Sequence, residues 1–461
     1  MVYKKNNFWN VTVIYSIGFL GLRAISFLLL PLYTNLLSAN EAGYIFILYT
    51  IIAFLNTLYS HGMDSSLLKY YQENNSQKII TTSLLYSILW GILLSLVLYF
   101  LHQPLKYFNV VSIYSSQHIA LLVIGILFSD MISSRLMTVI RLLEKPIYFL
   151  VVSFANVLLS IFLNIYFVKE LNMGFNGALL ALLCVSIIQL VLLLPLLIFN
   201  LRLYKFDFVL LKKMLHFSIP FLPASIFFIM IEMSDRLMLG WLSSVEDVGL
   251  YGTGYKVGAI ILLIVRAFNL NWQPFYLKND NGVEQFEKIG SRFIVFLIFI
   301  STIITMIWPL LFKIKINNIY LIGETFWMGG VIIPIIAFSY VLYGLFILQM
   351  PSIYIKNKHT WVPYFWGFGF IVNFVSNYLL IPIYGFYGAA YSTLFAYLSM
   401  ASFLLYKNQT WLQIKYNLKD ILYISTVSGL ALIGVCCFEL VLILILYFMV
   451  GTFKIYKMQQ A

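Results

Sequence analysis

The sequence predicts an all-α integral membrane protein with about 14 transmembrane helices. Of its 461 residues, 62% are apolar and only 10% are charged, whereas soluble domains have roughly 45–50% apolar and about 25% charged residues. Apolar runs recur along the whole chain at the length of about 20 residues that a helix needs to cross a hydrocarbon core. Runs such as 84–101 and 179–199 are apolar on every side, which is typical of helices and not of barrel strands.

Fourteen candidate spans follow from these runs. They are 11–32, 42–63, 79–101, 118–140, 147–168, 176–200, 215–241, 248–273, 291–312, 326–350, 361–382, 386–406, 420–437 and 438–454. The first run is too long for the apolar part of a signal peptide, and no small-residue cleavage site follows it, so we interpret it as a membrane helix. The last two spans are short and almost continuous, so a total of thirteen is an alternative.

The positive charges test this assignment independently. With these spans, twenty Lys and Arg residues fall in loops on one side of the membrane, and only Lys106, Lys169, Lys313 and Lys315 fall on the other. Cytoplasmic loops of membrane proteins are enriched in Lys and Arg. We therefore expect a multi-pass protein of the cell membrane with both termini in the cytoplasm. The same enrichment accounts for the net charge of +12, which gives no reason to expect a nucleic-acid partner.

Two pairs of similar segments indicate an internal repeat at an offset of about 205–211 residues. LLSANEAGY (36–44) resembles WLSSVEDVGLY (241–251), and NIYFVKELNMGFNGA (164–178) resembles NYLLIPIYGFYGA (377–389). Both matches join helices of corresponding number and equal orientation, so the repeat is parallel. It predicts a six-helix lobe in 1–200, a second in 201–410, an additional helix pair in 411–461, and a substrate path between the lobes.

Charged residues inside the spans are the most informative set in the sequence. They are Arg23, Asp130, Arg135, Glu232, Asp235, Arg236, Lys256 and Arg266. Each lipid-exposed charge costs about 2.5–3.5 kcal/mol, so eight would cost about 20–28 kcal/mol, more than a marginally stable fold can bear. These side chains must therefore face water or one another. Five cations against three acids predict a net cationic cavity, which suits an anionic substrate, and Arg binds phosphate in a bidentate manner.

Structural roles remain open for several of these charges. Glu232 and Arg236 are four residues apart, the favourable spacing for an ion pair on one helix, and Arg236 also lies near the outer helix end. Asp130 and Arg135 are five apart and share a face poorly, which leaves open a partner on another helix or an Arg135 side chain that reaches toward the cytoplasm.

A functional role is favoured where no acid lies nearby on the same helix. This holds for Arg23, whose helix contains no acid, and for Arg266, which has none within a turn or two. Lys256 lies in GTGYKVG (252–258), whose glycines allow close helix packing or local unwinding, and both interpretations of this lysine stay open.

Signs of cofactor or catalytic chemistry are missing from the sequence. Cys184, Cys436 and Cys437 fall inside apolar runs without metal-ligand spacing, and we find no catalytic triad, metalloprotease motif or nucleotide loop. We therefore expect no metal, no cofactor and no enzymatic activity. The 33 Tyr and nine Trp are interpreted as belts at the membrane interface, although aromatic residues along a sugar path would give the same composition.

Four segments carry a resemblance to a known family. They are RAISFLLLPLYTNLLSANEAGY (23–44), EKP (144–146), IPFLPASIFFIMIEMSDRLMLGWLSSVEDVGLYGTGYKVG (219–258) and NYLLIPIYGFYGAAYST (377–393). Over essentially its whole length the chain resembles the polysaccharide transport family, that is, O-antigen-type flippases of the multidrug/oligosaccharidyl-lipid/polysaccharide exporter superfamily. The third segment is the most specific of the four.

The resemblance implies a flippase for surface polysaccharides such as O-antigen, capsule or exopolysaccharide. Such proteins move an undecaprenyl-pyrophosphate-linked oligosaccharide from the inner to the outer leaflet of the bacterial membrane by alternating access, with a polysaccharide polymerase and chain-length machinery as partners. It implies that Arg23 and Arg266 bind the pyrophosphate. The sequence adds Lys256, Arg236 and Arg135 as further cavity cations, and the three acids as coupling or pairing groups.

Two alternatives remain open beside the flippase. A cation-coupled multidrug exporter of the same superfamily would carry embedded acids in its first helix or its C-terminal lobe, and the first helix here has none. A membrane polysaccharide polymerase would share the Tyr-rich composition, but such enzymes have a large outer loop, and the longest outer loops here are about 102–117 and 313–325.

Overall fold

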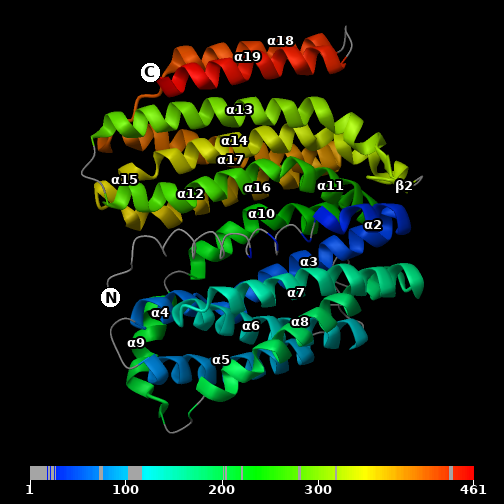
Figure 1. Cartoon of the computed structure of the whole chain (residues 1–461), viewed down its shortest axis with the longest axis vertical. Coiled ribbons are helices and arrows are strands. Elements are labelled where there is room, and N and C mark those ends of the chain that lie inside the picture. The colour runs from blue at the N-terminus through cyan, green and yellow to red at the C-terminus, as the bar shows by residue number, and fades with distance from the viewer. Residues whose placement is uncertain are drawn as a thin grey trace. The chain divides into compact units, whose positions relative to one another are not determined.

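The computed structural model shows an all-α membrane fold (Figure 1). It describes residues 18, 21, 25, 27–71, 76–101, 117–200, 202, 205–219, 222–278, 282–316, 319–435 and 440–460. The chain divides into two compact units, Met1–Ile229 and Met230–Ala461. The lobe limits near residues 200 and 410 that the repeat suggests stay predictions.

The described residues of the first unit are almost entirely helical. Its elements are α2 (Leu30–Leu36), α3 (Ala39–Ser60), α4 (Met63–Tyr70), α5 (Ser76–Leu101), α6 (Gln117–Leu142), α7 (Pro146–Asn164), the π-helix η3 (Ile165–Glu170), α8 (Gly174–Asn200) and α9 (Phe208–Ser218). Helix α6 is central, because it packs against α3, α4, α5, α7 and α8. Helix α10 (Leu222–Leu242) then continues from this unit into the second.

The second unit holds the remaining helices and a short hairpin. Its elements are α11 (Val245–Gly258), α12 (Ile260–Lys278), α13 (Val283–Lys313), β1 (Lys315–Ile316), β2 (Ile319–Tyr320), the 3-10 helix η6 (Glu324–Ile332), α14 (Ile333–Gln349), α15 (Pro351–Ile355), the 3-10 turn η7 (His359–Trp361), α16 (Val362–Tyr384), α17 (Phe386–Trp411), α18 (Leu418–Val435) and α19 (Leu440–Gln460). Strands β1 and β2 pair antiparallel. Helices α18 and α19 pack on each other and on α13 (Figure 1).

Nine helices in the described ranges are long and apolar enough to cross a membrane, or ten if α11 and the first part of α12, bent by 45°, form one span. The membrane fold is therefore confirmed, whereas the count of fourteen is not. The first predicted span, 11–32, lies mostly outside the described residues, and the last two correspond to α18 and α19.

Three predicted spans differ in detail from the helices of the structure. The span 42–63 ends at Ser60, because His61 and Gly62 adopt left-handed conformations with φ of 33° and 74°. The span 215–241 is divided between the end of α9 and α10, in a stretch where the sequence has prolines at 220 and 223, which lack the backbone N–H that a helix interior needs. The span 326–350 starts as the 3-10 helix η6.

The repeated segments have matching backbone features. Ser38 and Ser244 are the N-caps of α3 and α11, and each accepts a hydrogen bond from the backbone N–H of an acid three residues later. Gly174 and Gly385 have φ of 55° and 54° where α8 and α17 begin. The sequence similarity therefore reflects the same local solutions for starting a helix.

Candidate functional site

The carboxylate of Glu232 is the centre of a buried polar network in the second unit. Glu232 lies on α10 and is only 4% exposed. Its carboxylate accepts hydrogen bonds from the hydroxyls of Tyr397 and Tyr340 and from Nη2 of Arg266, the last at 3.4 Å. The hydroxyls of Tyr255 and Tyr340 are also hydrogen bonded to each other. Donors from α12, α14 and α17 thus converge on one carboxylate.

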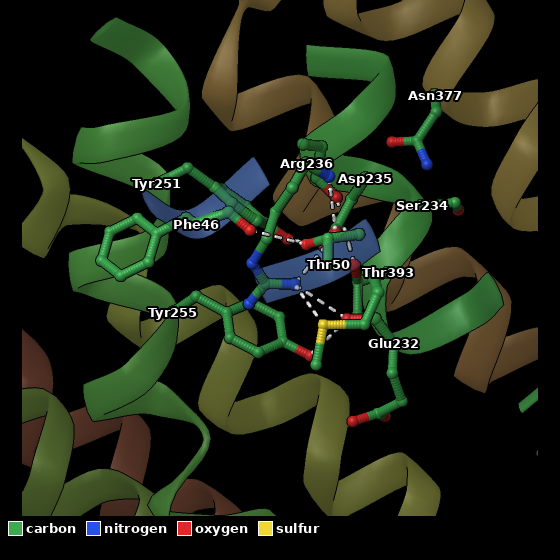
Figure 2. A network of polar contacts seen from close by, with 12 residues as sticks. Phe46, Thr50, Glu232, Ser234, Asp235, Arg236, Tyr251, Tyr255, Asn377 and Thr393 are labelled. Atoms are coloured by element: carbon green, nitrogen blue, oxygen red, sulfur yellow. Dashed lines mark hydrogen bonds and ion pairs between the residues drawn. The ribbon is translucent and has the colours of Figure 1, made fainter. Parts of the chain in front are cut away.

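A second ion pair lies one helical turn further along α10. Nη1 of Arg236 is 3.2 Å from Oδ1 of Asp235 and donates to the backbone oxygen of Glu232 at 2.9 Å. The Arg236 guanidinium lies over the ring of Tyr255, 4.2 Å from its centroid (Figure 2). The hydroxyl of Tyr251 donates to Oδ2 of Asp235. Burial of both charges is compensated by each other and by aromatic and hydroxyl contacts.

The expected pairing of Glu232 with Arg236 is therefore only half correct. The two residues are connected as the spacing predicts, but the bond goes to the Glu232 backbone oxygen. The carboxylate of Glu232 instead pairs with Arg266, for which the sequence offered no acid on its own helix. The structure joins these two predicted residues through a contact between α10 and α12.

Accessibility separates the cations of this set. The side chain of Arg266 is 29% exposed, that of Arg236 is 8% and that of Arg135 is 0%. Lys256, on α11, is half-buried and close enough to Arg236 for their charges to interact. Of the three arginines, Arg266 is thus the most accessible to a molecule from outside the protein.

Arg135 belongs to a different cluster, in the first unit. It forms an ion pair with Asp64, and its Nε and Nη2 donate to the Ser87 hydroxyl at 3.1 Å and the Ser60 backbone oxygen at 2.7 Å. Asp64 lies in the first turn of α4, shortly after the left-handed residues His61 and Gly62. Because the predicted span 42–63 ends one residue before Asp64, this acid was not counted among the charges inside the spans. Arg135 therefore has a partner on another element, not Asp130.

Asp130 lies among neutral polar groups. Its side chain has hydrogen bonds with Ser186 on α8 and Asn56 on α3. No ion pair connects Asp130 to a cation among the residues that the structure describes. Arg23 lies outside the described residues, so its predicted role remains a prediction.

Tyrosine side chains are the main functional candidates that the sequence interpretation missed. Tyr251, Tyr255, Tyr340 and Tyr397 are each at most 5% exposed, so these four do not belong to an interface belt. A signal was present, since Tyr251 and Tyr255 are one helical turn apart inside the most specific segment. Tyr340 and Tyr397 carry no local signal, because only tertiary packing brings them to Glu232.

The charges of this network are paired with one another by protein side chains. Within the described ranges, no group of three or more His, Cys, Asp or Glu side chains is placed to bind a metal ion. The two tyrosine hydroxyls would leave the Glu232 carboxylate with hydrogen-bond partners if the Arg266 guanidinium moved away from it.

Comparisons with known proteins agree with this fold. A family model described as polysaccharide biosynthesis protein matches residues 8–274. The structure of a lipid II flippase, MurJ, in an inward closed conformation matches with a TM-score of 0.70 and 15% identity, over 97% of this chain and 100% of that one. None of the curated proteins matches the chain.

Two multidrug transporter structures are similar as well. An inward-facing multidrug resistance MATE family transporter of the MOP superfamily has a TM-score of 0.62 and 12% identity, over 84% of this chain and 94% of that one. The Vibrio cholerae MATE transporter VcmN in the bent form has a TM-score of 0.53 and 14% identity, over 88% and 96%. At these identities the likeness shows the fold alone, while the family model covers more than half of the chain. The chain therefore belongs to the polysaccharide biosynthesis protein family.

Proposed function

We propose that this protein is a flippase for an anionic lipid-linked oligosaccharide in surface polysaccharide synthesis. Its substrate would be a polyprenyl-pyrophosphate repeat unit such as an undecaprenyl-pyrophosphate-linked oligosaccharide, moved from the inner to the outer leaflet of the bacterial cytoplasmic membrane by alternating access. The family match over 8–274 and the fold shared with a lipid II flippase support this proposal. Movement between leaflets requires no covalent step, so we propose no catalytic residue.

Arg266 is the single observation that carries the proposal. Its side chain is the most exposed of the three described arginines predicted inside the spans, and it lies beside a carboxylate that has two tyrosine donors of its own. A guanidinium stays charged at any physiological pH and matches the geometry of phosphate oxygens. We propose that the pyrophosphate binds Arg266 in exchange for Glu232, while Arg236 and Lys256 contribute positive potential.

The ion pairs divide the remaining charges by role. Asp235 and Glu232 act as pairing acids for Arg236 and Arg266. Arg135 has no exposed surface and is paired with Asp64, so we propose that it stabilises the first unit. Arg23 remains a second candidate for the pyrophosphate. A polysaccharide polymerase and chain-length machinery would be its protein partners in this pathway. Both termini of the chain would face the cytoplasm.

The test replaces Arg266 in a strain whose only copy of the gene carries the variant. Loss of a charged hydrogen bond costs about 1.5–3 kcal/mol, which lowers substrate affinity about 10- to 150-fold. Arg266→Ala should therefore strongly reduce surface polysaccharide. Lipid-linked repeat units should accumulate on the cytoplasmic side. Arg266→Lys should be intermediate, because it keeps the charge but not the bidentate geometry. Arg202→Ala, an exposed arginine in a loop, serves as the control.

Membrane abundance of each variant must be measured alongside polymer. If Arg266→Ala at normal abundance makes normal polymer, the proposed substrate site is wrong. Reduced polymer without accumulated lipid-linked units would place the defect before translocation and would also contradict the proposal.

Asp130 favours a second candidate function, a cation-coupled multidrug exporter. An acid inside a membrane segment, held by Ser186 and Asn56 and with no ion-pair partner in the described part of the chain, is the kind of group that exchanges a cation for coupling. An Asp130→Asn variant with unchanged polymer but lower resistance to cationic drugs would favour the exporter. Reduced polymer with unchanged drug resistance would instead make Asp130 part of the flippase.

A further inference from the structure

Helix α9 (Phe208–Ser218) lies on the chain between two membrane-length helices. It begins eight residues after α8 ends at Asn200 and ends four residues before α10 begins at Leu222. Asp207 is its N-cap, with a side chain that accepts from the backbone N–H of Leu210 at 3.0 Å. The hydrogen-bonded Lys78 ammonium lowers the pKa of the Asp207 carboxyl. With 11 residues, α9 is too short to cross a membrane, so it must run along the protein surface.

One face of α9 is fixed to the first unit. Leu210, Leu211 and Met214 are buried, and the helix packs on α4 and α5. The hydroxyl of Ser66 donates to the Met214 backbone oxygen at 2.7 Å, and Nζ of Lys69 lies 4.0 Å from the centroid of the Phe217 ring. These contacts determine which side of α9 faces away from the protein.

The opposite face combines large apolar side chains with lysines. Phe208 is 71% exposed and Val209 is 66% exposed, and Lys212 and Lys213, which follow on the same face, are exposed as well. Neither lysine forms an ion pair within the described ranges. Asp207 is the only acid between residues 200 and 222, and its charge is compensated by Lys78. This face is therefore both apolar and cationic.

We propose that α9 is an interfacial helix that binds anionic phospholipid. Phe208 and Val209 would enter the boundary between headgroups and acyl chains, and Lys212 and Lys213 would bind headgroup phosphates. An exposed apolar surface between two membrane segments, only a few residues from each, lies at the depth where headgroups are found. Lysines extend their apolar stems along such a boundary while their ammonium groups reach the phosphates. The site differs from the Arg266 network in location and ligand.

A fluorescent probe at Val209 tests the insertion. The full-length chain, with Cys184, Cys436 and Cys437 replaced by Ser, carries Val209→Cys labelled with an environment-sensitive dye. In vesicles containing phosphatidylglycerol, we expect blue-shifted emission and quenching by lipids with a nitroxide near the headgroup. Lys358→Cys, an exposed position in another loop, should give solvent-like emission. Solvent-like emission from position 209 in vesicles would overturn the proposal. This holds even if the probe is protected from solvent in native membranes, because another protein could cover it there.

Neutralising the lysines tests the charge. Each Lys near an anionic surface contributes about fivefold to binding, so Lys212→Gln with Lys213→Gln should weaken phosphatidylglycerol binding to the purified protein about 25-fold. Binding of phosphatidylcholine should not change. The control is Lys356→Gln with Lys358→Gln, an exposed pair with the same charge. An equal loss in both double variants, or no loss in either, would contradict a specific site on α9.

Discussion

Glu232 shows how a single acid is accommodated inside a membrane protein. Its carboxylate accepts two tyrosine hydroxyls and one guanidinium, and these donors come from three different helices. A buried charge is tolerated only when its hydrogen-bond capacity is filled. The tyrosines are therefore as much part of the network as the arginine, because they fill hydrogen-bond positions of the same carboxylate.

Tyr397→Phe should destabilise the protein by about 1.5–3 kcal/mol, the usual loss for a hydrogen bond to a charged group. Tyr343→Phe is the matched control, since Tyr343 lies in the same cluster and its hydroxyl has no hydrogen bond within the described ranges. Thermal unfolding of the purified proteins in the same lipid mixture provides the measurement. Equal midpoints for the two variants would mean that the Tyr397 hydroxyl contributes nothing.

Arg135 and Asp64 should behave as a coupled pair. Removing one partner of a buried ion pair costs about 3–5 kcal/mol, because the other charge is left uncompensated. We therefore expect Arg135→Met alone to be strongly destabilised and the double variant with Asp64→Leu to recover part of that loss. A double-mutant cycle on unfolding free energies gives the coupling. Strictly additive losses would show that the two charges do not interact.

Close backbone approach between elements depends on glycines in α11. A methyl group on Gly254 would overlap the backbone oxygen of Gly329 in η6, and one on Gly258 would press on Ile336 in α14. The structure shows both features that the GTGYKVG sequence allowed, because the glycines pack closely and the helix bends by 45° where the segment ends, between α11 and α12. This packing brings Tyr255 and Tyr340 within reach of each other, so the glycines also position the network around Glu232.

Gly254→Ala should cost about 1–3 kcal/mol, the usual penalty for overpacking. Gly429→Ala is a matched control, because Gly429 lies in α18 and a methyl group there would meet nothing within 4 Å. Alanine is the better helix former, so this control should be neutral or up to about 1 kcal/mol more stable. The measurement is the unfolding midpoint, and similar shifts in both variants would contradict close packing at Gly254.

At the level of the whole chain, the sequence predicts best what depends on composition and local chemistry. Membrane helices can be predicted from the length of the apolar runs. The repeat is visible because Ser38 and Ser244 both cap helix N-termini, and because Gly174 and Gly385 both adopt a positive φ where a helix begins. What the sequence cannot predict is the choice of tertiary partners. Arg266 pairs with Glu232 and Arg135 with Asp64 across helices, and no spacing along one helix contains that information. The helix end at Ser60 was missed for another reason, since the left-handed conformation of His61 is uncommon for any residue other than glycine.

The orientation of the chain in the membrane can be tested on one helix. The continuous helix of α7 and η3, Pro146–Glu170, has 25 residues, which is about 37 Å at 1.5 Å per residue and enough to cross a bilayer. Lys145 precedes it and Lys169 lies at its other end, and both are exposed. The charge distribution places Lys145 among the twenty basic residues on the predicted cytoplasmic side and Lys169 among the four on the other.

Single cysteines at these two positions, in a chain without its natural cysteines, should therefore differ in labelling. With a membrane-impermeant maleimide, Lys169→Cys should react in intact cells, whereas Lys145→Cys should react only after permeabilisation. The two sites are matched in residue type, exposure and helix, so a difference reports orientation alone. Reaction of Lys145→Cys in intact cells would invert this span and, because successive spans alternate, would place the predicted cytoplasmic loops outside. The exposed lysines of α9 would then face the outer leaflet, while the ion pairs inside each unit would be unaffected.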